Sequence, residues 1–256
     1  MNQDVEISRS GRLLTIRLNR TEKKNALTGA MYAAMAEAVA GAEADLGVGA
    51  ILFLGSEGCF TAGNDLGDFQ ENPPRDKSAP VYRFILALTR STVPIVAAVD
   101  GLAIGIGTTL LLHCDVAFAS PDARFQLPFV NLGLLPEAGS TYLLPKLMGH
   151  TKASELIMSC RPFNGEEALS LGLVNQVCDA SQLEQTAVDA AQGIAKKPPR
   201  TLRRAKALLK HDRLDVERQI HAEILEFSEC LDSPETEEAL SAFAEKRKPN
   251  FSKLME

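Results

Sequence analysis

Cys59–Leu66 reads CFTAGNDL and follows an apolar run, Ala50 to Gly55, that is typical of a buried strand. The small residues Ala62 and Gly63 allow a ligand to approach the backbone closely. Asp65 can cap a helical turn that follows. An ordinary strand-to-helix turn would explain the same residues, and this segment alone favours that plainer interpretation.

A second turn reads DGLAIGIGTT, Asp100 to Thr109, and joins the apolar strand Ile95 to Val99 to a helix over Thr108 to His113. Its glycines suggest a dinucleotide-binding turn, but the G-x-G-x-x-G spacing fails because Leu110 occupies the last position. A helix N-terminus remains, and its free N–H groups, including that of Ile106, favour a developing negative charge.

A third segment, Phe125 to Thr141, reads FQLPFVNLGLLPEAGST and contains a single acidic residue, Glu137. A helix is expected to begin near Ser140, so this carboxylate could simply complement the helix dipole. It could also be a base whose pKa is raised by apolar neighbours, as proton abstraction near neutral pH requires. From these residues alone the structural role is favoured.

The order of the other elements predicts an α/β protein. Val5 to Ser8 and Leu13 to Leu18 alternate as a hairpin around Gly11, and Thr28 can cap a helix to about Ala44. Asn72 to Pro80 is expected to be a surface loop. After Val177 the strands stop, and helices are predicted over Leu183 to Ala195, Pro199 to Leu209, Asp215 to Leu231 and Pro234 to Lys246. The predicted division is a core over residues 1–195 and a helical region over 196–256.

Composition narrows the class of protein. The 256 residues are 45% hydrophobic, and the net charge of −6 argues against a nucleic-acid partner. The five cysteines are widely spaced without a CxxC pair, no leader opens the chain, and no apolar stretch reaches the length of a membrane span. A cytoplasmic protein is expected. The scattered histidines predict no metal site. The seven lysines and arginines between Lys196 and Lys210 predict a solvated helix face.

The three segments together resemble the crotonase (enoyl-CoA hydratase/isomerase) superfamily. Its F-x-A-G-x-D-[LI] turn matches Phe60 to Leu66, and its glycine-rich turn before a helix ending in Cys-Asp matches Gly101 to Asp115. Val130 to Pro136 and Ala242 to Phe251 are similar to its late segment and its C-terminal signature. The resemblance implies an α/β crotonase fold of repeated ββα units, with a C-terminal helical trimerisation region. It also implies a homotrimer or a dimer of trimers.

The resemblance also implies site residues. The backbone amides of Ala62 and Ile106 would form an oxyanion hole for a thioester oxygen. An acyl-CoA thioester would be the substrate, and no cofactor is expected. The residues expected to bind it are Lys24, Ala26, Ala62, Gly63, Asn64, Asp65, Leu66, Gly105, Phe129 and Lys246.

The reaction is narrowed by two positions that hold glutamates in hydratases of this family. Here they hold Thr109 and Phe129, so paired activation of water is not expected. Glu137, after Pro136, is similar to the carboxylate of peroxisomal-type Δ3,Δ2-enoyl-CoA isomerases, which implies a double-bond shift from 3-enoyl-CoA to 2-enoyl-CoA with one acid/base. An epoxyphenylacetyl-CoA isomerase is the alternative enzyme. A non-catalytic CoA-binding module is the alternative of another class.

Overall fold

The computed structural model describes residues 4–254, and within them six strands form one sheet in the order β1-β2-β3-β4-β6-β9. The hairpin β1–β2 is antiparallel, and each later neighbour runs parallel to the one before it. The strands are β1 (Val5–Ser10), β2 (Leu13–Leu18), β3 (Ala50–Leu54), β4 (Ile95–Val99), β6 (Val116–Ala119) and β9 (Gln176–Val177).

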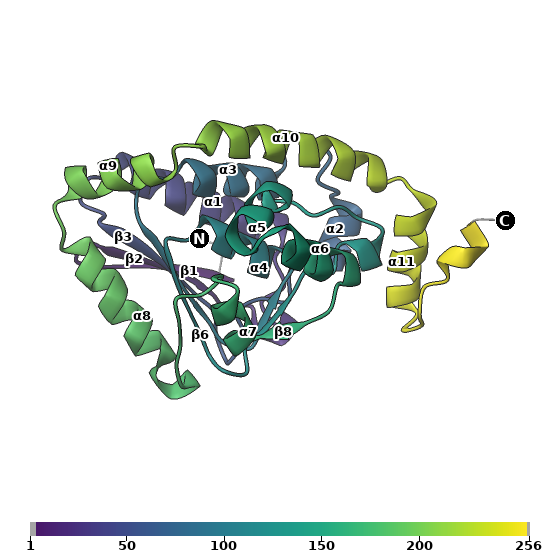
Figure 1. Ribbon diagram of the computed structural model, residues 1–256, viewed down its shortest axis with the longest axis horizontal. Coiled ribbons are helices and arrows are strands. Elements are labelled where there is room, and N and C mark those ends of the chain that lie inside the picture. Colours follow the sequence, from purple (N-terminus) through teal and green to yellow (C-terminus); the bar gives the residue numbers. More distant parts are fainter. Residues whose placement is uncertain (1–3, 255–256) are drawn as a thin grey trace.

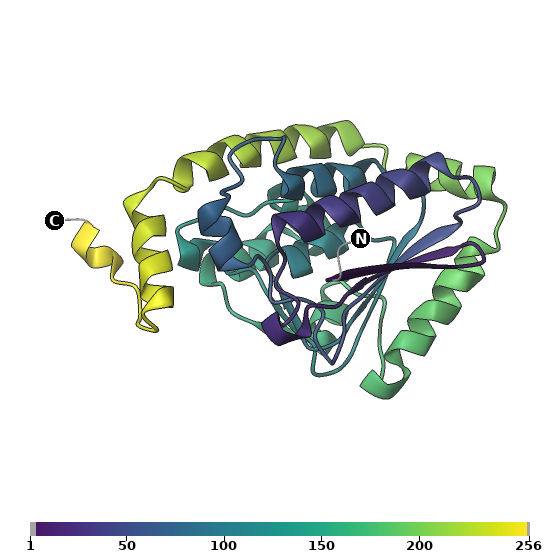
Figure 2. The same ribbon diagram turned by 180° about the vertical axis from the view of Figure 1, so that it is seen from behind.

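Both faces of this sheet are covered, which explains why its central strands are continuously apolar. Ile51 and Phe53 of β3 face the helices α1 (Gly29–Ala44) and α3 (Pro80–Arg90). Leu52, which points the opposite way, faces α8 (Ala180–Ala195). Figure 2 shows α1 and α3 on one side of the strands and α8 on the other. The period-two alternation of a strand thus divides the core into two layers.

A smaller sheet of three strands among the described residues carries the second turn, and the sequence analysis missed it. Its strands are β5 (Leu102–Ile104), β7 (Arg124–Gln126) and β8 (Phe163–Asn164). A bridge pairs Thr61 with Ala103 of β5, so the two glycine-containing turns lie side by side. The backbone then continues through α4 (Ile106–Thr109) into the 3-10 helix η2 (Leu110–His113). Short strands of this kind have no clear period, which is why the pattern did not reveal them.

Short helices connect these parts. They are η1 (Thr21–Lys23), α2 (Leu66–Glu71), η3 (Val130–Leu132), α5 (Ser140–Met148), α6 (His150–Ser159) and α7 (Gly165–Ser170). The predicted hairpin, the Thr28-capped helix and the helix near Ser140 are confirmed, and Thr28 accepts a hydrogen bond from the amide of Met31. The predicted loop 72–80 ends where α3 begins, and Arg75 in it forms a bidentate ion pair with Asp232.

The C-terminal helices are α9 (Pro199–Leu209), α10 (Arg213–Cys230) and α11 (Pro234–Ala244), followed by the 3-10 helix η4 (Phe251–Leu254). Figure 1 shows α9 and α10 lying along the body of the molecule, whereas α11 and η4 project from it. Helix α10 packs on α3 and α5. The predicted helical region therefore includes two helices that cover the core. Within residues 4–254, no helix combines the length and apolarity needed to cross a membrane.

The basic run between Lys196 and Lys210 corrects one prediction, because part of it faces inward rather than toward solvent. Arg203 donates to the carbonyls of Ala42, Glu43 and Asp45, at the C-terminal end of α1. A cation suits this end of a helix because its last carbonyls lack partners and carry partial negative charge. Lys206 is also buried. Residues three apart share a helix face, and here that face holds the cations.

Lys206 connects α9 to the residues that precede two strands of the main sheet, β4 and β6. Its ammonium lies 2.7 Å from the Asp115 carboxylate and donates to the carbonyl of Val93 over 2.7 Å. Asp115 in turn accepts a hydrogen bond from the amide of Ile95 at the start of β4. The chain after residue 196 is thus tied into the sheet by a buried charge.

We predict that Lys206→Met lowers the free energy of unfolding by about 3 kcal/mol, because Asp115 loses its buried counter-charge while the apolar volume is retained. Urea unfolding followed by circular dichroism measures this. Lys196→Met is the matched control on the exposed side of the same segment, and equal stabilities of the two variants would contradict the assignment.

Candidate active site

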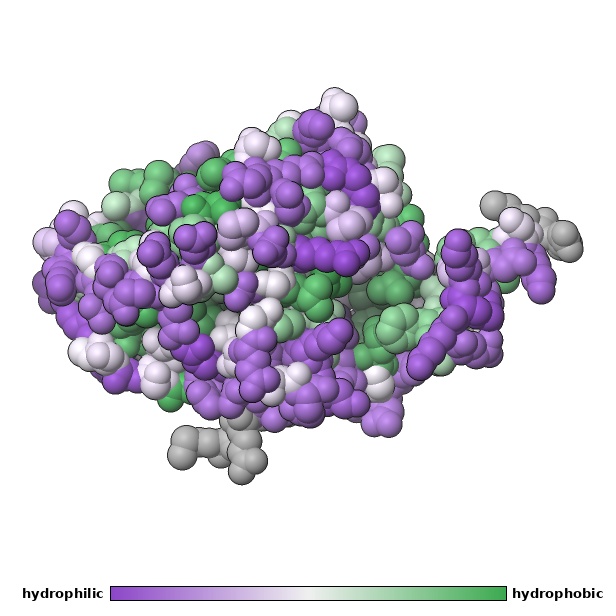
Figure 3. Space-filling model, turned by 90° about the horizontal axis from the view of Figure 1, so that it is seen from below, coloured by the Kyte–Doolittle hydropathy of each residue, from purple (hydrophilic) through white to green (hydrophobic). Residues whose placement is uncertain are grey.

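An apolar cavity of about 560 Å³ lies where the three sequence segments meet. Its size suits a small-molecule ligand. In the space-filling view, hydrophobic residues gather in a hollow between the body of the molecule and the projecting C-terminal elements α11 and η4 (Figure 3). The lining residues are Lys23, Ala26, Ala62, Gly63, Asn64, Asp65, Leu66, Phe69, Ile104, Gly105, Ile106, Pro128, Phe129, Leu132, Leu134, Phe227 and Phe243.

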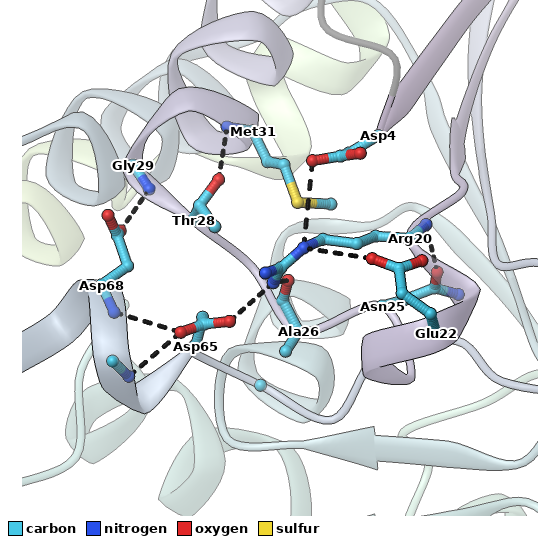
Figure 4. A network of polar contacts seen from close by, with 12 residues as sticks. Asp4, Arg20, Glu22, Asn25, Ala26, Thr28, Gly29, Met31, Asp65 and Asp68 are labelled. Carbon is cyan, nitrogen blue, oxygen red and sulfur yellow. Dashed lines mark hydrogen bonds and ion pairs between the residues drawn. The ribbon is translucent and has the colours of Figure 1, made fainter.

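A polar network fixes the first turn, as Figure 4 shows. Arg20 donates to the Asp65 carboxylate over 2.6 Å and to the Ala26 carbonyl over 2.9 Å. The other oxygen of Asp65 accepts from the amides of Gly67 and Asp68, which confirms the predicted helix cap. Arg20 holds the pKa of Asp65 below its usual value. The Asp65 side chain is therefore used for structure, and it holds the turn against the loop that contains Ala26.

Gly63 shows why the turn requires a glycine. Its φ is +90°, and a Cβ atom at this position would lie 2.9 Å from the carbonyl oxygen of Ile104 in β5. A side chain would therefore separate the two turns. The close approach at Gly63 is made by β5, whereas the sequence analysis assigned it to a ligand.

The backbone amides at the cavity correct the assignment of Ala62. Its N–H donates to the carbonyl of Lys24 over 2.9 Å, so it is not free to bind a ligand oxygen. Asn64 lies two residues further along and forms a β-bridge with Leu27. The two hydrogen bonds of this bridge use the carbonyl of Gly63 and the amide of Asp65, so they leave the amide of Asn64 unused. Within residues 4–254, the N–H groups of Asn64 and of Ile106, the first residue of α4, have no acceptor. Both residues line the cavity.

Glu137 is a buried carboxylate with one oxygen held and one unoccupied. Only 5% of its surface is exposed. Its Oε1 accepts a hydrogen bond of 2.5 Å from the hydroxyl of Thr109, whereas Oε2 has no hydrogen-bond partner among the described residues. Burial raises the pKa of Glu137 to about 8, the Thr109 bond acts against this rise, and the Glu223 carboxylate adds to it. Such a group can exchange a proton near neutral pH.

Glu137 is not among the residues that line the cavity. Phe129 and Leu134 belong to the lining, and Glu137 follows Leu134 by three residues. Thr109, which holds Glu137, lies three residues beyond Ile106 in α4, about one helical turn from its free amide. The charge of Glu137 also acts on Tyr32, whose hydroxyl donates to the side-chain oxygen of Asn64 over 2.5 Å. These contacts connect the carboxylate to the two turns that carry the free amides of Asn64 and Ile106.

The remaining predicted residues fall into two groups. Ala26, Gly63, Leu66, Gly105 and Phe129 line the cavity. The side chains of Lys24 and Lys246 are exposed and do not line the cavity. Lys23 and Phe243, which lie near them in the sequence, line it instead. No cluster of three or more histidines, cysteines, aspartates or glutamates capable of holding a metal ion occurs between residues 4 and 254.

Sequence reasoning missed three contributors to this site. From the sequence, Thr109 indicates only that a hydratase glutamate is missing, whereas in the structure its hydroxyl donates a hydrogen bond to Glu137. Phe227 and Glu223 come from α10, which had been assigned to a separate helical region. A signal for them existed, since Ile220, Glu223 and Phe227 share one buried face at helical spacing, and a glutamate on such a face is unusual.

The chain is similar to members of one protein family over almost its full length. The sequence model of the family described as Enoyl-CoA hydratase/isomerase matches residues 8–254. The chain is 32% identical over 253 residues to the short-chain-enoyl-CoA hydratase of Clostridium acetobutylicum, with 96% of each covered. It is 32% identical over 250 residues to the 1,2-epoxyphenylacetyl-CoA isomerase of Escherichia coli, with 94% of this chain and 95% of that protein covered.

Two further comparisons extend this picture. Enoyl-CoA delta isomerase 2 of Rattus norvegicus is 34% identical over 215 residues, which cover 82% of this chain and 55% of that protein. Among solved structures, OdaA of Pseudomonas aeruginosa has a TM-score of 0.92 and 47% identity, with 94% of this chain and 99% of that chain covered. The relatives therefore include both hydratases and isomerases.

We predict that Glu137→Gln stabilises the fold increasingly as the pH rises. The pKa of Glu137 is about 8 in the folded chain against 4.5 as its ordinary value, so between these pH values folding retains a proton that the unfolded chain releases. The stability of the unsubstituted protein is lowered across that window by roughly 1.4 kcal/mol per pH unit, and the substitution removes this cost. Urea unfolding of both proteins at pH 5 and pH 8 measures it, and a stability difference independent of pH would contradict it.

Proposed function

The chain belongs to the enoyl-CoA hydratase/isomerase family, and on that premise we propose that it isomerises 3-enoyl-CoA to 2-enoyl-CoA with Glu137 as its single acid/base. The observation that carries the proposal is the buried Glu137, with a pKa of about 8, one oxygen anchored by Thr109 and the other without a partner within residues 4–254. A 1,3-proton shift requires one such group, which accepts a proton and returns it.

In the first step, the ionised Glu137 takes a proton from C2 of the substrate through Oε2. The electron pair of the broken C–H bond moves into a C1–C2 double bond, and the thioester carbonyl oxygen becomes negative. The product is a dienolate, conjugated from the oxygen to C4. At pH 7, a group with a pKa near 8 is ionised in about a tenth of the molecules, which suffices for turnover.

In the second step, the protonated Glu137 delivers the same proton to C4. The oxygen charge returns to the carbonyl, and the remaining double bond joins C2 and C3 in conjugation with the thioester. Thr109 holds Oε1 throughout, so the carboxylate can serve both carbons with its other oxygen by a small movement. The proton balance closes without water or a second acid.

The free amides of Asn64 and Ile106 are assigned to the dienolate oxygen. They replace the pair first predicted from the sequence, since the amide of Ala62 is bonded to Lys24. Each donor of this kind commonly contributes roughly 3 kcal/mol to the stabilisation of the transition state, because it meets charge that develops during the reaction. The Ile106 amide also lies at a helix N-terminus, but α4 has only four residues, so the stabilisation is assigned to the hydrogen bond and not to a helix dipole.

Hydration is disfavoured by the two positions that would supply its carboxylates. Thr109 is fully buried, and its hydroxyl is engaged with Glu137. Phe129 is apolar and 6% exposed. A water molecule would therefore meet one carboxylate instead of a pair, even though some relatives are named as hydratases. The 32% identity to an epoxyphenylacetyl-CoA isomerase makes that reaction the second candidate, since it also fits a site with one acidic residue.

Assembly into a trimer, or a dimer of trimers, is also proposed. The C-terminal helices expose large apolar side chains that a monomer would leave in water, a common sign of an interface. They are Leu208, Leu209, Leu214, Leu225 and Phe243. Lys246, which lies outside the cavity lining, would then contact the CoA of a neighbouring subunit, and Lys24 the CoA of its own.

We expect Glu137→Gln to lower the turnover of 3-enoyl-CoA by about a thousandfold, because the amide cannot accept the proton. In the unsubstituted enzyme, kcat/KM should rise about tenfold per pH unit toward a plateau above pH 8, following ionisation of Glu137. Absorbance of the conjugated product measures both. The same protein is tested with 2-enoyl-CoA hydration and epoxyphenylacetyl-CoA. Strong hydration, or turnover of the variant near that of the unsubstituted enzyme, would overturn the proposal.

Thr109→Val is expected to raise the pKa of Glu137 further, because it removes the hydrogen bond that favours the ionised form. The rise of kcat/KM should then shift to higher pH, with a loss of about tenfold at pH 7. Thr109→Ser retains the hydroxyl and is the matched control, which should keep the original pH profile. Identical profiles for the valine and serine variants would show that the hydroxyl is not involved.

A further inference from the structure

A second buried carboxylate, Glu223 of α10, holds the turn that follows Glu137. It is 5% exposed. Its Oε2 accepts a hydrogen bond of 2.6 Å from the amide of Gly139. Its Oε1 accepts from the amide of Thr141 over 3.0 Å and from the hydroxyl of Thr141 over 2.5 Å. Gln219, one helical turn earlier in α10, donates to that same hydroxyl oxygen over 2.8 Å.

The same turn is held from its other side by His113 of η2. This side chain is buried, and burial, with the nearby Lys210 charge, lowers its pKa to about 3, so it is neutral. Its Nε2 must carry the proton, since it donates to the carbonyl oxygen of Ala138 over 2.8 Å. The peptide between Ala138 and Gly139 therefore has its carbonyl fixed by His113 and its amide fixed by Glu223.

The backbone between the contacts made by Glu223 and His113 is in the left-handed region, which is costly for an alanine. Ala138 has a φ of +63° and Gly139 a φ of +70°, both in the left-handed region. A non-glycine residue occupies that region at a cost and persists there only where surrounding structure determines it. Ala138 directly follows Glu137, so this conformation sets the direction in which the carboxylate leaves the backbone.

We propose that Glu223 is a positioning residue for the isomerisation, which fixes the 137–141 turn so that the free oxygen of Glu137 faces the substrate. The inference rests on the proposed function, because it assumes that Glu137 is the base. Glu223 touches no reacting atom. It acts through the backbone of Gly139 and Thr141, and its charge adds to the field that Glu137 experiences.

A role as a simple helix cap does not account for this arrangement. Helix α5 begins at Ser140, and a side chain at its own N-cap could satisfy the first amides, as Thr28 does for α1. The N-cap here is Gly139, and the acceptor comes from a glutamate 84 residues away in the sequence. Burying a carboxylate beside another carboxylate is costly, so the pairing is explained better by the position that it gives to Glu137.

The titratable groups that face the pair come from several elements. Burial and the negative charges of Glu137 and Glu223 raise the pKa of Tyr82 of α3. Tyr32 of α1 senses Glu137 in the same way. His113 of η2 is neutral, and Lys210 at the C-terminal end of α9 donates to the carbonyls of Leu88 and His113 rather than to either carboxylate. Removing the charge of Glu223 should therefore make Glu137 easier to ionise.

The test compares Glu223→Gln with Glu226→Gln, a control at an exposed position of the same helix. Glutamine has the same shape but presents an NH₂ group where one of the donors now points, so the turn loses a hydrogen bond. We expect kcat for 3-enoyl-CoA to fall on the order of tenfold to a hundredfold, with KM nearly unchanged. The rise of kcat/KM with pH should shift to lower pH. The control should match the unsubstituted enzyme in both measurements.

Thr141→Val supplies the second variant, because it removes the hydroxyl hydrogen bond and leaves Glu223 its two backbone amide bonds. It should lower kcat less than Glu223→Gln does, and it remains informative if Glu223→Gln does not fold. Burial raises the pKa of Glu223 to about 7 and the hydroxyl bond opposes that rise, so its loss should reduce the negative charge beside Glu137 and shift the rise of kcat/KM to lower pH. An inactive Glu137→Gln variant, together with Glu223→Gln and Thr141→Val variants that retain full kcat and the original pH profile, would overturn the inference alone. An active Glu137→Gln variant would instead overturn the proposed function.

Discussion

The structure depends on one bridge between two turns, the pairing of Thr61 with Ala103. It brings the end of one buried strand beside a three-stranded sheet, and it leaves the amides of Asn64 and Ile106 at the edge of a single cavity. Ile106 is buried and Asn64 is partly buried, and their amides, which have no acceptor within residues 4–254, are free to bind a ligand oxygen at this apolar cavity. The network from Arg20 through Asp65, and the closeness of Gly63 to β5, keep them in that state.

The buried and partly buried carboxylates of the protein differ in how many hydrogen-bond donors they meet. Asp65, Asp115 and Glu223 each meet several donors, whereas Glu137 meets a single hydroxyl. Each donor stabilises the ionised form, so the bonds from Arg20 and the amides hold the pKa of Asp65 below its usual value. Burial raises the pKa of Glu137 to about 8 and that of Glu223 to about 7, and the three donors to Glu223 act against its rise. Burial keeps the Glu137 carboxylate away from water, and the buried side chains of Phe129 and Leu134 form part of the cavity wall.

The sequence was sufficient for the fold and for much of the site, for physical reasons. The α/β order of the longer elements is confirmed, because long apolar strands and helices carry clear periods. The crotonase fold, which the resemblance of the glycine-containing motifs implied, is confirmed by the family model and the solved structures. The Ala62 assignment failed because a motif names residues without showing which amide is already bonded. Short strands such as β5 were missed for lack of a period. The inward face of the basic run was missed because charge alone does not reveal which carbonyls lie beneath it.

Helix α10 carries both Glu223, which holds the turn after Glu137, and Phe227, which lines the cavity one turn later. Successive residues of an α-helix are rotated by about 100° around its axis. Inserting or deleting a single residue within α10 before Glu223 would therefore rotate both side chains together relative to the earlier turns of the helix. The number of residues within these turns is thus constrained by the active site, even where their identity is free to vary.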